Sequence, residues 1–472
     1  MNYFLNLLLN GREKGRQEVP AFSWIEQGQK INVQYDTFLK DLLEQTRIYC
    51  NLPQKRIGIW GENSYRWILS ALSLLAAGKC AVLLDANLQN EELLHLAGYT
   101  DCELILASDT LMEEKEYIKD HFPMMEIGGR FSEGNSDNSL DVKEEGELIF
   151  FTSGTSSSAK GVVFSADSFA KCIQARLSKG IWWGKNGDSW FIPVPFYHMY
   201  GLEMLFTELM RGGTVCIGTS PRLLIPEVRM LKPDVAVLVP TMVRFLLDKE
   251  TFAETTSQIL SAGGPCDKRL EQKAGAKGIT LFNVFGNSEV NGSCGVSDTK
   301  KGVEWLKPIG TARWVCSQEG ELGISHEFLM KGYYKRPMET AEVLRDGVMW
   351  IGDAGEIDED GYVHIEGRIR DTIVLENGKK VHIGDLQREL EELPEVLEAT
   401  AVGVAGVLTA VLVLKEGCTY EMIQKEIAAI NGKKPISHQI KKIVISDDPL
   451  PRTSTGKIRR FMVAEKYLKK KQ

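Results

Sequence analysis

The most informative stretch of this sequence is Glu147-Leu148-Ile149-Phe150-Phe151, followed by Thr152-Ser153-Gly154-Thr155-Ser156-Ser157-Ser158-Ala159-Lys160-Gly161. The first part is almost entirely apolar, as expected of a strand that is buried on both faces. The second part is rich in hydroxyls and glycines, and its backbone N–H groups can surround a polyphosphate. It is not a Walker loop, because Lys160 lacks the preceding glycine and the following serine or threonine. A polar linker without a ligand is the alternative interpretation.

Short apolar runs of the same kind alternate with amphipathic segments through the first three-quarters of the chain. Helices are predicted at Asn63 to Ala77 and at Ser165 to Lys179, where Asn63 and Ser165 are good capping residues. Alternating strands and helices predict an α/β fold with mostly parallel sheets in a large N-terminal domain of several subdomains. The other predicted strands are residues 56–60, 80–84, 103–107, 189–193, 235–239 and 280–284.

The pattern changes after Gly367-Arg368. Residues 372–375 and 380–381 flank a turn at Asn377-Gly378 and predict a hairpin. A charged helix over 385–392, strands at 399–404 and 409–414, and a further helix complete a small α+β unit of ordinary domain size. We therefore predict an N-terminal domain of residues 1–368 and a small C-terminal domain of residues 369–472, with a boundary near Arg370.

The composition limits the classes of function. The 472 residues are 43% hydrophobic and 25% charged, which is typical of a globular protein, and the formal net charge of -8 does not favour nucleic-acid binding. The nine cysteines are dispersed without a Cys-x-x-Cys pair, which favours a reducing compartment. The longest apolar stretch, Trp67 to Ala77, is too short to span a membrane, and the N-terminus does not resemble a signal peptide. We expect a cytoplasmic protein.

A second motif, Pro193-Val194-Pro195-Phe196-Tyr197-His198-Met199-Tyr200-Gly201, also follows a predicted strand. A histidine among aromatic side chains could orient or gate an apolar acid. A structural histidine with satisfied hydrogen bonds is the alternative.

A third motif combines Ser261-Ala262-Gly263-Gly264-Pro265 with Asn283-Val284-Phe285-Gly286-Asn287-Ser288-Glu289. The glycine pair permits a flat ligand to approach the backbone closely. Phe285 offers a stacking face, and Glu289 offers a hard oxygen ligand for Mg²⁺. A turn and a strand end with a surface glutamate would explain the same residues.

Two further motifs occur towards the C-terminus. In Trp350-Ile351-Gly352-Asp353 and Gly367-Arg368-Ile369-Arg370-Asp371, Asp353 could accept hydrogen bonds from ribose hydroxyls and Arg368 could reach ribose or phosphate. In Pro451-Arg452-Thr453-Ser454-Thr455-Gly456-Lys457-Ile458-Arg459-Arg460, Lys457 could enter a site as a mobile cation. A surface salt bridge and a basic loop are the alternatives.

Together, in this order, the five motifs resemble the adenylate-forming superfamily, which includes acyl- and aryl-CoA synthetases, peptide-synthetase adenylation domains and firefly luciferase. Residues 152–161 resemble its phosphate loop, and residues 285–289 its aromatic-Gly-x-Thr-Glu segment. Residues 367–371 resemble its hinge and 451–460 its C-terminal lysine motif. A further family signature resembles Gly320-Glu321-Leu322 together with Gly332-Tyr333-Tyr334, Pro337 and Thr340.

The resemblance implies ATP-dependent activation of a carboxylic acid to an acyl-adenylate, with release of pyrophosphate. It implies Lys457, His198 and Glu289 as catalytic residues, and Glu289 with Thr152 as Mg²⁺ ligands. The implied acid pocket consists of His198, Val239, Pro240, Thr241, Gly263 and Gly264. The implied ATP-binding residues are Thr152, Ser153, Gly154, Thr155, Ser156, Ser157, Lys160, Gly264, Pro265, Phe285, Gly286, Asn287, Ser288, Asp353, Arg368 and Lys457.

In the second half-reaction the resemblance implies that the small domain, residues 369–472, is mobile and rotates about a hinge at Arg370, and that the acyl group is transferred to a thiol. The thiol belongs to coenzyme A or to the phosphopantetheine of a separate acyl carrier protein. The 61–67 and 195–201 segments resemble those of bacterial fatty-acid CoA ligases, so a fatty or other unaminated acid is expected. Ser156-Ser157 and Ala159 stand where the family usually has Thr-Gly and Pro. A non-catalytic nucleotide-binding relative is the alternative from another functional class.

Overall fold

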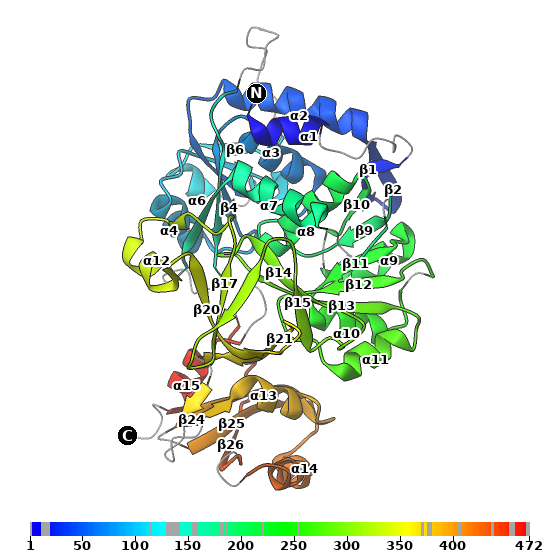
Figure 1. Ribbon diagram of the computed structural model, residues 1–472, viewed down its shortest axis with the longest axis vertical. Helices are drawn as coiled ribbons and strands as arrows, with labels where there is room; N and C mark the ends of the chain where they lie inside the picture. The colour runs from blue at the N-terminus through cyan, green and yellow to red at the C-terminus, as the bar shows by residue number, and fades with distance from the viewer. Residues whose placement is uncertain are drawn as a thin grey trace. The chain divides into compact units, whose positions relative to one another are not determined.

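The computed structural model describes residues 2–10, 19–112, 116–128, 142–152, 159–179, 183–185, 187–219, 221–252, 254–369, 372–374, 380–404, 407–435, 439–452 and 458–468. The chain divides into two compact units (Figure 1). The larger unit contains residues 1–315, 324–350 and 357–364, and the smaller one contains 316–323, 351–356 and 365–472. The predicted boundary between residues 368 and 369 remains a prediction.

One sheet of the larger unit has seven strands with a parallel centre. β3, β4, β5, β6 and β7 are parallel neighbours, whereas β8 and β18 add antiparallel strands at one edge. Its core is the apolar cluster of Trp60, Val82, Leu84, Ile105 and Ile149 with their neighbours. The order is β18 (Gly332–Tyr333), β8 (Gly161–Ser165), β7 (Glu147–Phe151), β4 (Cys80–Leu84), β3 (Arg56–Trp60), β5 (Leu104–Ala107) and β6 (Met124–Glu126).

The second sheet of this unit also has a parallel centre. β1, β10, β9, β11, β12 and β13 run parallel, and β2, β14, β15 and β21 are antiparallel to their neighbours. The order is β2 (Gln29–Gln34), β1 (Pro20–Glu26), β10 (Thr214–Ile217), β9 (Ser189–Ile192), β11 (Val235–Leu238), β12 (Gln258–Ser261), β13 (Thr280–Asn287), β14 (Gly292–Ser297), β15 (Trp305–Pro308) and β21 (Val363–Arg368). The remaining strands are β16 (Arg313–Cys316), β17 (Glu321–Ser325), β19 (Leu344–Arg345) and β20 (Val348–Ile357).

Helices cover both sheets. α7 (Ala166–Ser178) and α8 (Met199–Arg211) pack against each other, α7 also against β8, and α8 against β9 and β10 (Figure 1). These two helices therefore join the two sheets into one unit. The others are α1 (Tyr3–Asn10), α2 (Tyr35–Cys50), α3 (Tyr65–Ala76), α4 (Asn90–Tyr99), α5 (Asp109–Met112), α6 (Glu116–Lys119), η1 (Pro221–Leu223), α9 (Leu224–Leu231), α10 (Pro240–Asp248), α11 (Lys268–Gly275) and α12 (Pro337–Val343).

The smaller unit has an α+β core of its own. β24 (Val396–Val404) is antiparallel to β25 (Val407–Leu414), which is parallel to β26 (Lys442–Ile445). α13 (Ile383–Glu391) and α14 (Tyr420–Gly432) contribute Leu390 and Ile423 to its apolar core. β22 (Thr372–Val374) pairs with β23 (Lys380–His382) as the predicted hairpin, and α15 (Arg460–Leu468) completes the unit.

The structure corrects the predicted start of one helix. α3 begins at Tyr65, and its N-cap is Ser64, whose hydroxyl accepts the N–H of Trp67 at 3.1 Å. Asn63 does not cap the helix. Its amide instead donates to the carbonyl oxygens of Val194 at 3.0 Å and Gly218 at 3.2 Å, and accepts the N–H of Phe196 at 2.9 Å. The predicted cap at Ser165 is confirmed, because its hydroxyl accepts the N–H of Ser168.

Candidate active site

The predicted phosphate loop leaves β7 and returns to β8, and the structure describes both of its ends. The N–H of Thr152 donates to the carbonyl oxygen of Lys160 at 3.1 Å, and the N–H of Lys160 donates to the Thr152 hydroxyl at 3.2 Å. These two bonds hold the loop ends together. Ser153, Gly154, Thr155, Ser156 and Ser157 lie outside the described residues.

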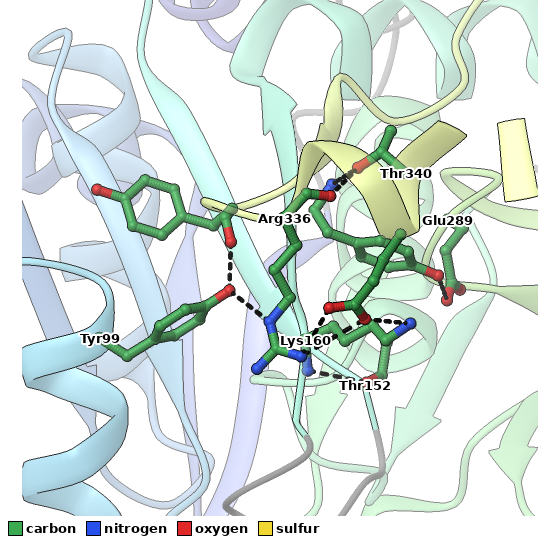
Figure 2. A network of polar contacts seen from close by, with 9 residues as sticks. Tyr99, Thr152, Lys160, Glu289, Arg336 and Thr340 are labelled. Carbon is green, nitrogen blue, oxygen red and sulfur yellow. Dashed lines mark hydrogen bonds and ion pairs between the residues drawn. The ribbon is translucent and has the colours of Figure 1, made fainter. Parts of the chain in front are cut away.

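The Lys160 side chain lies in a network of charged and aromatic groups (Figure 2). Its ammonium is 2.7 Å from the Glu339 carboxylate and 4.6 Å from the centre of the Tyr333 ring. The Lys160 ammonium, and to a smaller extent Arg336, hold the pKa of the Glu339 carboxyl below its ordinary value. About a third of each of the Lys160 and Glu339 side chains is exposed, so the cation remains accessible from solvent.

The predicted metal ligand Glu289 lies in the turn between β13 and β14. Its Oε1 accepts a hydrogen bond from the Tyr333 hydroxyl at 2.9 Å, and Tyr333 is thus shared between Glu289 and Lys160. Asn287, another predicted site residue, accepts the N–H of Val290 with its side chain and closes the turn. Gly286 precedes it at a register shift, where a Cβ would lie 2.3 Å from the carbonyl oxygen of Gly292. Ser288 occupies the turn itself.

The acidic turn with Glu289 suits a Mg²⁺ ion that is bound together with the phosphates of a nucleotide. Among the described residues no group of three or more histidine, cysteine or acidic side chains could hold a metal ion. Mg²⁺ is usually bound by one or two carboxylates together with substrate phosphates and water, and not by a cage made entirely of protein. In the described part of the chain, Oε2 of the half-buried Glu289 accepts no hydrogen bond, so it could serve as such a carboxylate ligand.

A buried polar network supports this turn, and the sequence did not predict it. Arg176 of α7 pairs with Glu203 of α8 and donates to the carbonyl oxygen of Asn291 at 2.7 Å. The other Glu203 oxygen accepts both the N–H and the hydroxyl of Ser293, at 2.9 and 2.8 Å. His326 lies 2.9 Å from the carbonyl oxygen of Val290. The signal in the sequence was the presence of two glutamates, Glu203 and Glu208, inside the largely apolar segment of α8.

The predicted adenine-binding residues follow neighbouring parallel strands. Ser261 of β12 is in register with Asn283 of β13, so the glycine pair and Phe285 both lie beyond the carboxyl ends of this parallel region. Ligands of open α/β sheets bind at such ends. Gly263 has a φ of +83°, in the left-handed region that favours glycine. The Phe285 ring lies 5.3 Å from that of Trp314, and Gly264 is followed by Pro265.

The predicted acid pocket combines residues that precede two helices. His198 is the N-cap residue of α8, and its ring lies 4.8 Å from that of Tyr197. Val239 is the N-cap residue of α10, with Pro240 at the first helical position and Thr241 after it. Gly263 lies beside Val239, since a Cβ built on Gly263 would be 3.7 Å from Val239 Cγ1. The structure therefore brings the 239–241 and 263–264 segments together.

The remaining predicted residues belong to the smaller unit. Arg368 Nε lies 3.0 Å from Oδ1 of the buried Asp353, and Arg368 Nη1 donates to the Ile351 carbonyl oxygen at 2.7 Å. Arg368 and Asp353 therefore form one group. Lys457 and the predicted hinge residue Arg370 lie outside the described residues. On either side of Lys457, Arg452 and Ile458 form an antiparallel bridge.

Comparison with known sequences decides the family. The family model described as AMP-binding enzyme matches residues 52–334, and the model described as AMP-binding enzyme C-terminal domain matches residues 370–470. The chain belongs to the AMP-binding enzyme family. The predicted membership of the adenylate-forming superfamily is confirmed, and the protein is an enzyme of that superfamily.

Individual relatives of this AMP-binding enzyme agree with the fold. The 2-succinylbenzoate–CoA ligase of Bacillus cytotoxicus is 25% identical over 435 residues, which cover 86% of this chain and 87% of the relative. The structure of o-succinylbenzoate CoA synthetase from Bacillus subtilis, in complex with AMP, superposes with a TM-score of 0.83 at 19% identity and 98% coverage of both chains. Amide bond synthetase McbA from Marinactinospora thermotolerans gives a TM-score of 0.82 at 19% identity, covering 98% of this chain and 99% of that one.

The α/β fold class, with a large N-terminal and a small C-terminal part, is confirmed by these structures. The relatives give no support to the predicted connection with fatty acids, because the Bacillus cytotoxicus and Bacillus subtilis proteins are both named for succinylbenzoate. In the part of the chain that the structure describes, no helix combines the length and apolar character needed to cross a membrane.

Proposed function

We propose that this AMP-binding enzyme uses ATP and Mg²⁺ to convert a carboxylic acid of the 2-succinylbenzoate type to an acyl-adenylate and transfers the acyl group to coenzyme A. The observation that carries the proposal is the common position of Lys160 and Glu289, which share Tyr333 at the mouth of the predicted phosphate loop. The Lys160 ammonium, together with Oε2 of Glu289, which accepts no hydrogen bond from the described residues, suits the phosphates of ATP and their Mg²⁺. The ligase from Bacillus cytotoxicus supports the choice of acid.

The chemistry requires two anions to meet, because a carboxylate oxygen must attack the α-phosphorus of ATP. Catalysis of this kind depends mainly on positioning and on neutralising charge. In this chain we assign the β- and γ-phosphates to residues 152–161 and adenine to Phe285, Gly264 and Pro265. Lys457 is assigned the carboxylate and the α-phosphate. When bound, Mg²⁺ supplies further neutralisation of the phosphate charge.

The acid is assigned to the segments that precede α8 and α10. Tyr197 and His198 lie in a segment that Asn63 holds through two hydrogen bonds, to Val194 and Phe196, and residues 239–241 lie beside the glycine pair. Aromatic side chains before α8 and glycine backbone beside residues 239–241 would suit a planar aryl acid.

Transfer to the thiol follows adenylation. We assign this step to rotation of the small unit about Arg370, which removes Lys457 from the reaction centre. Coenzyme A is the proposed acceptor because the ligases that resemble this chain are named for it. The phosphopantetheine of a separate carrier protein is the other acceptor to be tested.

An ATP–pyrophosphate exchange assay with a panel of acids tests the proposal. We expect exchange with 2-succinylbenzoate to exceed exchange with benzoate and with medium- and long-chain fatty acids. Addition of coenzyme A is expected to yield the thioester, and a phosphopantetheinylated carrier protein is expected to yield none. Exchange with fatty acids alone would refute the proposed acid, and absence of exchange with every acid would refute the adenylation itself.

A further inference from the structure

The segment from Gly332 to Thr340 contains the signature residues Gly332, Tyr333, Tyr334, Pro337 and Thr340. It runs beside the strand that follows Lys160. Gly332 and Tyr333 form β18, which pairs with Val163 and Val162 of β8, and the N–H of Tyr334 donates to the Gly161 carbonyl oxygen at 2.7 Å. The segment is therefore attached by its backbone to the return strand of the phosphate loop.

The signature residues explain how the segment folds. The Thr340 hydroxyl accepts the N–H of Tyr333 at 2.9 Å and donates to the Arg336 carbonyl oxygen at 2.8 Å. Gly332 has a φ of +147°, and a Cβ there would lie 3.0 Å from Thr340 Cγ2. Pro337 occupies the first turn of α12, where its missing N–H has no consequence. These contacts fix the direction in which the Tyr333 and Glu339 side chains leave the segment.

Tyr333 contacts both charged residues of the proposed site. Its ring is almost completely buried, and its hydroxyl donates to Glu289 at 2.9 Å. The ammonium of Lys160 lies over the face of the same ring. A phenol that donates to a carboxylate forms a charge-assisted hydrogen bond, which is stronger than a neutral one. Tyr333 therefore holds Glu289 in one orientation, with Oε1 occupied.

Glu339 acts in the same way on Lys160. Its carboxylate lies 2.7 Å from the Lys160 ammonium and 3.1 Å from Arg336 Nη1, and Arg336 Nε donates to the Tyr99 hydroxyl at 3.3 Å (Figure 2). An ammonium carries three protons, so one bond to Glu339 leaves two for phosphate oxygens. Glu339 therefore restricts the Lys160 rotamers without occupying the whole cation.

We propose that residues 332–340 form a positioning element in which Tyr333 orients Glu289 towards the metal and Glu339 orients Lys160 towards the phosphates of ATP. The proposal rests on the proposed function, because it takes Glu289 as a Mg²⁺ ligand and Lys160 as a phosphate ligand. Neither Tyr333 nor Glu339 touches the reacting atoms. Their effects on ATP binding differ: Tyr333 acts on the part of the binding that needs Mg²⁺, and Glu339 acts with or without the metal.

Calorimetric titration with ATP, in the presence and absence of Mg²⁺, separates the two effects. We expect Tyr333→Phe to weaken ATP binding about tenfold with Mg²⁺ and to leave metal-free binding unchanged, since one hydrogen bond to a charged group is lost. Glu339→Ala is expected to weaken binding in both conditions by a similar factor. Glu339→Gln, which retains an oxygen acceptor, is expected to recover part of the loss.

Two matched controls lie on this segment and on the helix that ends it. Tyr334→Phe removes a hydroxyl that bonds to Asp101, and Glu342→Ala removes an exposed carboxylate from the same helix as Glu339. Both are expected to bind ATP like the wild type. Equal weakening by Tyr333→Phe and Tyr334→Phe, or a Tyr333→Phe effect that is the same without metal, would overturn the role of Tyr333. Unchanged binding in Glu339→Ala would overturn that of Glu339.

A double-mutant cycle keeps the role of Tyr333 testable even if Tyr333→Phe lowers the stability of the protein. If Tyr333 acts through Glu289, then adding Tyr333→Phe to Glu289→Gln changes Mg²⁺-dependent ATP binding by less than twofold, whereas independent effects multiply. Multiplication of the two effects contradicts the proposal. Wild-type protein that binds no ATP and catalyses no exchange refutes the proposed function as well. If the wild type catalyses exchange but the variants bind ATP as the wild type does, the positioning element alone is refuted.

Discussion

Arg176 and Glu203 form a buried ion pair beneath the turn that carries Glu289. The two side chains are 8% and 2% exposed, and together they bind Asn291 and Ser293 on either side of Gly292. The pair joins α7, α8 and the β13–β14 turn, which are far apart in the sequence. A rigid support of this kind is what a single carboxylate in a turn needs in order to keep one orientation.

Removal of one member of this pair is expected to destabilise the larger unit. Arg176→Met leaves the Glu203 carboxylate buried without its cation, and we expect the free energy of unfolding to fall by about 3–5 kcal/mol. Urea denaturation followed by tryptophan fluorescence measures the change. The control is Arg244→Met, which breaks a more exposed pair with Asp267 and is expected to cost less than about 1 kcal/mol. Equal effects of the two substitutions would contradict a structural role for the buried pair.

His326 is expected to make stability depend on pH. Its Nδ1 accepts the N–H of Phe328 at 3.1 Å and its Nε2 lies 2.9 Å from the Val290 carbonyl oxygen, so the neutral ring carries its proton on Nε2. Burial, and secondarily the charge of Arg176, lower its pKa from 6.5 to about 4. The unfolded chain therefore binds the proton first as the pH falls. The neutral His326 ring contributes about 3 kcal/mol to the free energy of unfolding above pH 6.5. This contribution is lost as the pH falls from about 6.5 to 4.

The comparison with His326→Gln isolates this contribution. We expect the free energy of unfolding of the wild type to fall more steeply than that of the variant between pH 7 and pH 4.5, since glutamine does not titrate. Denaturation curves at several pH values measure both slopes. Parallel pH profiles would show that His326 does not contribute.

Substitution of Gly286 tests the geometry of the acidic turn. A Cβ at this position would lie 2.3 Å from the backbone oxygen of Gly292. Because the clash is with backbone, no side-chain rotation can remove it. Gly286→Ala is expected to displace the turn, to cost about 1–3 kcal/mol of stability and to weaken ATP binding in Mg²⁺ at least tenfold. Gly98→Ala is the control, because a Cβ there meets nothing within 4 Å. Normal ATP binding by Gly286→Ala would show that the turn does not hold the metal.

Lys457→Ala is expected to abolish acid-dependent pyrophosphate release. The loss should be on the order of a hundredfold to a thousandfold, because one donor to the developing charge is removed. Conversion of a supplied acyl-adenylate to thioester should persist, since Lys457 has left the centre in that step. Lys470→Ala, in the C-terminal tail, is the control. A Lys457 variant with more than a tenth of the wild-type exchange rate would refute the assignment.

Arg370→Pro is expected to separate the half-reactions. Proline fixes φ near −65° and so restricts the rotation that the second step needs. Exchange of pyrophosphate should remain close to the wild-type rate, whereas thioester formation should fall by at least a hundredfold. A single-turnover experiment that follows adenylate and thioester separately makes the comparison. Equal loss of both steps would place the hinge elsewhere.

The strands were predictable because they are buried on both faces. The predicted runs at 56–60, 80–84 and 147–151 coincide with β3, β4 and β7, since such strands are apolar at every position. The start of α3 was less predictable. Asn63 and Ser64 both cap helices well, and a tertiary contact decided between them: the Asn63 amide binds Val194 and Phe196, which leaves Ser64 as the cap.

The candidate site was predictable only where its residues form contiguous motifs. Thr152 and Glu289 follow strands and Lys160 directly precedes one, so local patterns made them candidates. Arg176, Glu203 and His326 come from separate elements, and each resembles an ordinary charged or polar residue in its own segment. Their common position results from the packing of α7 and α8 against the β13–β14 turn. Pairing of Tyr333 with Glu289 likewise depends on how β18 adds to β8.

The Asn63 amide has a consequence for engineering substrate choice. It sits in the connection after β3, while its partners Val194, Phe196 and Gly218 follow strands β9 and β10 of the other sheet. A chimaera that imports residues 193–218 from a relative must import a compatible residue 63 as well. Otherwise three buried backbone groups lose their hydrogen-bond partner, at a cost of about 1–3 kcal/mol each. An exchange of residues 193–218 without residue 63 is therefore expected to give insoluble protein and not a new substrate specificity.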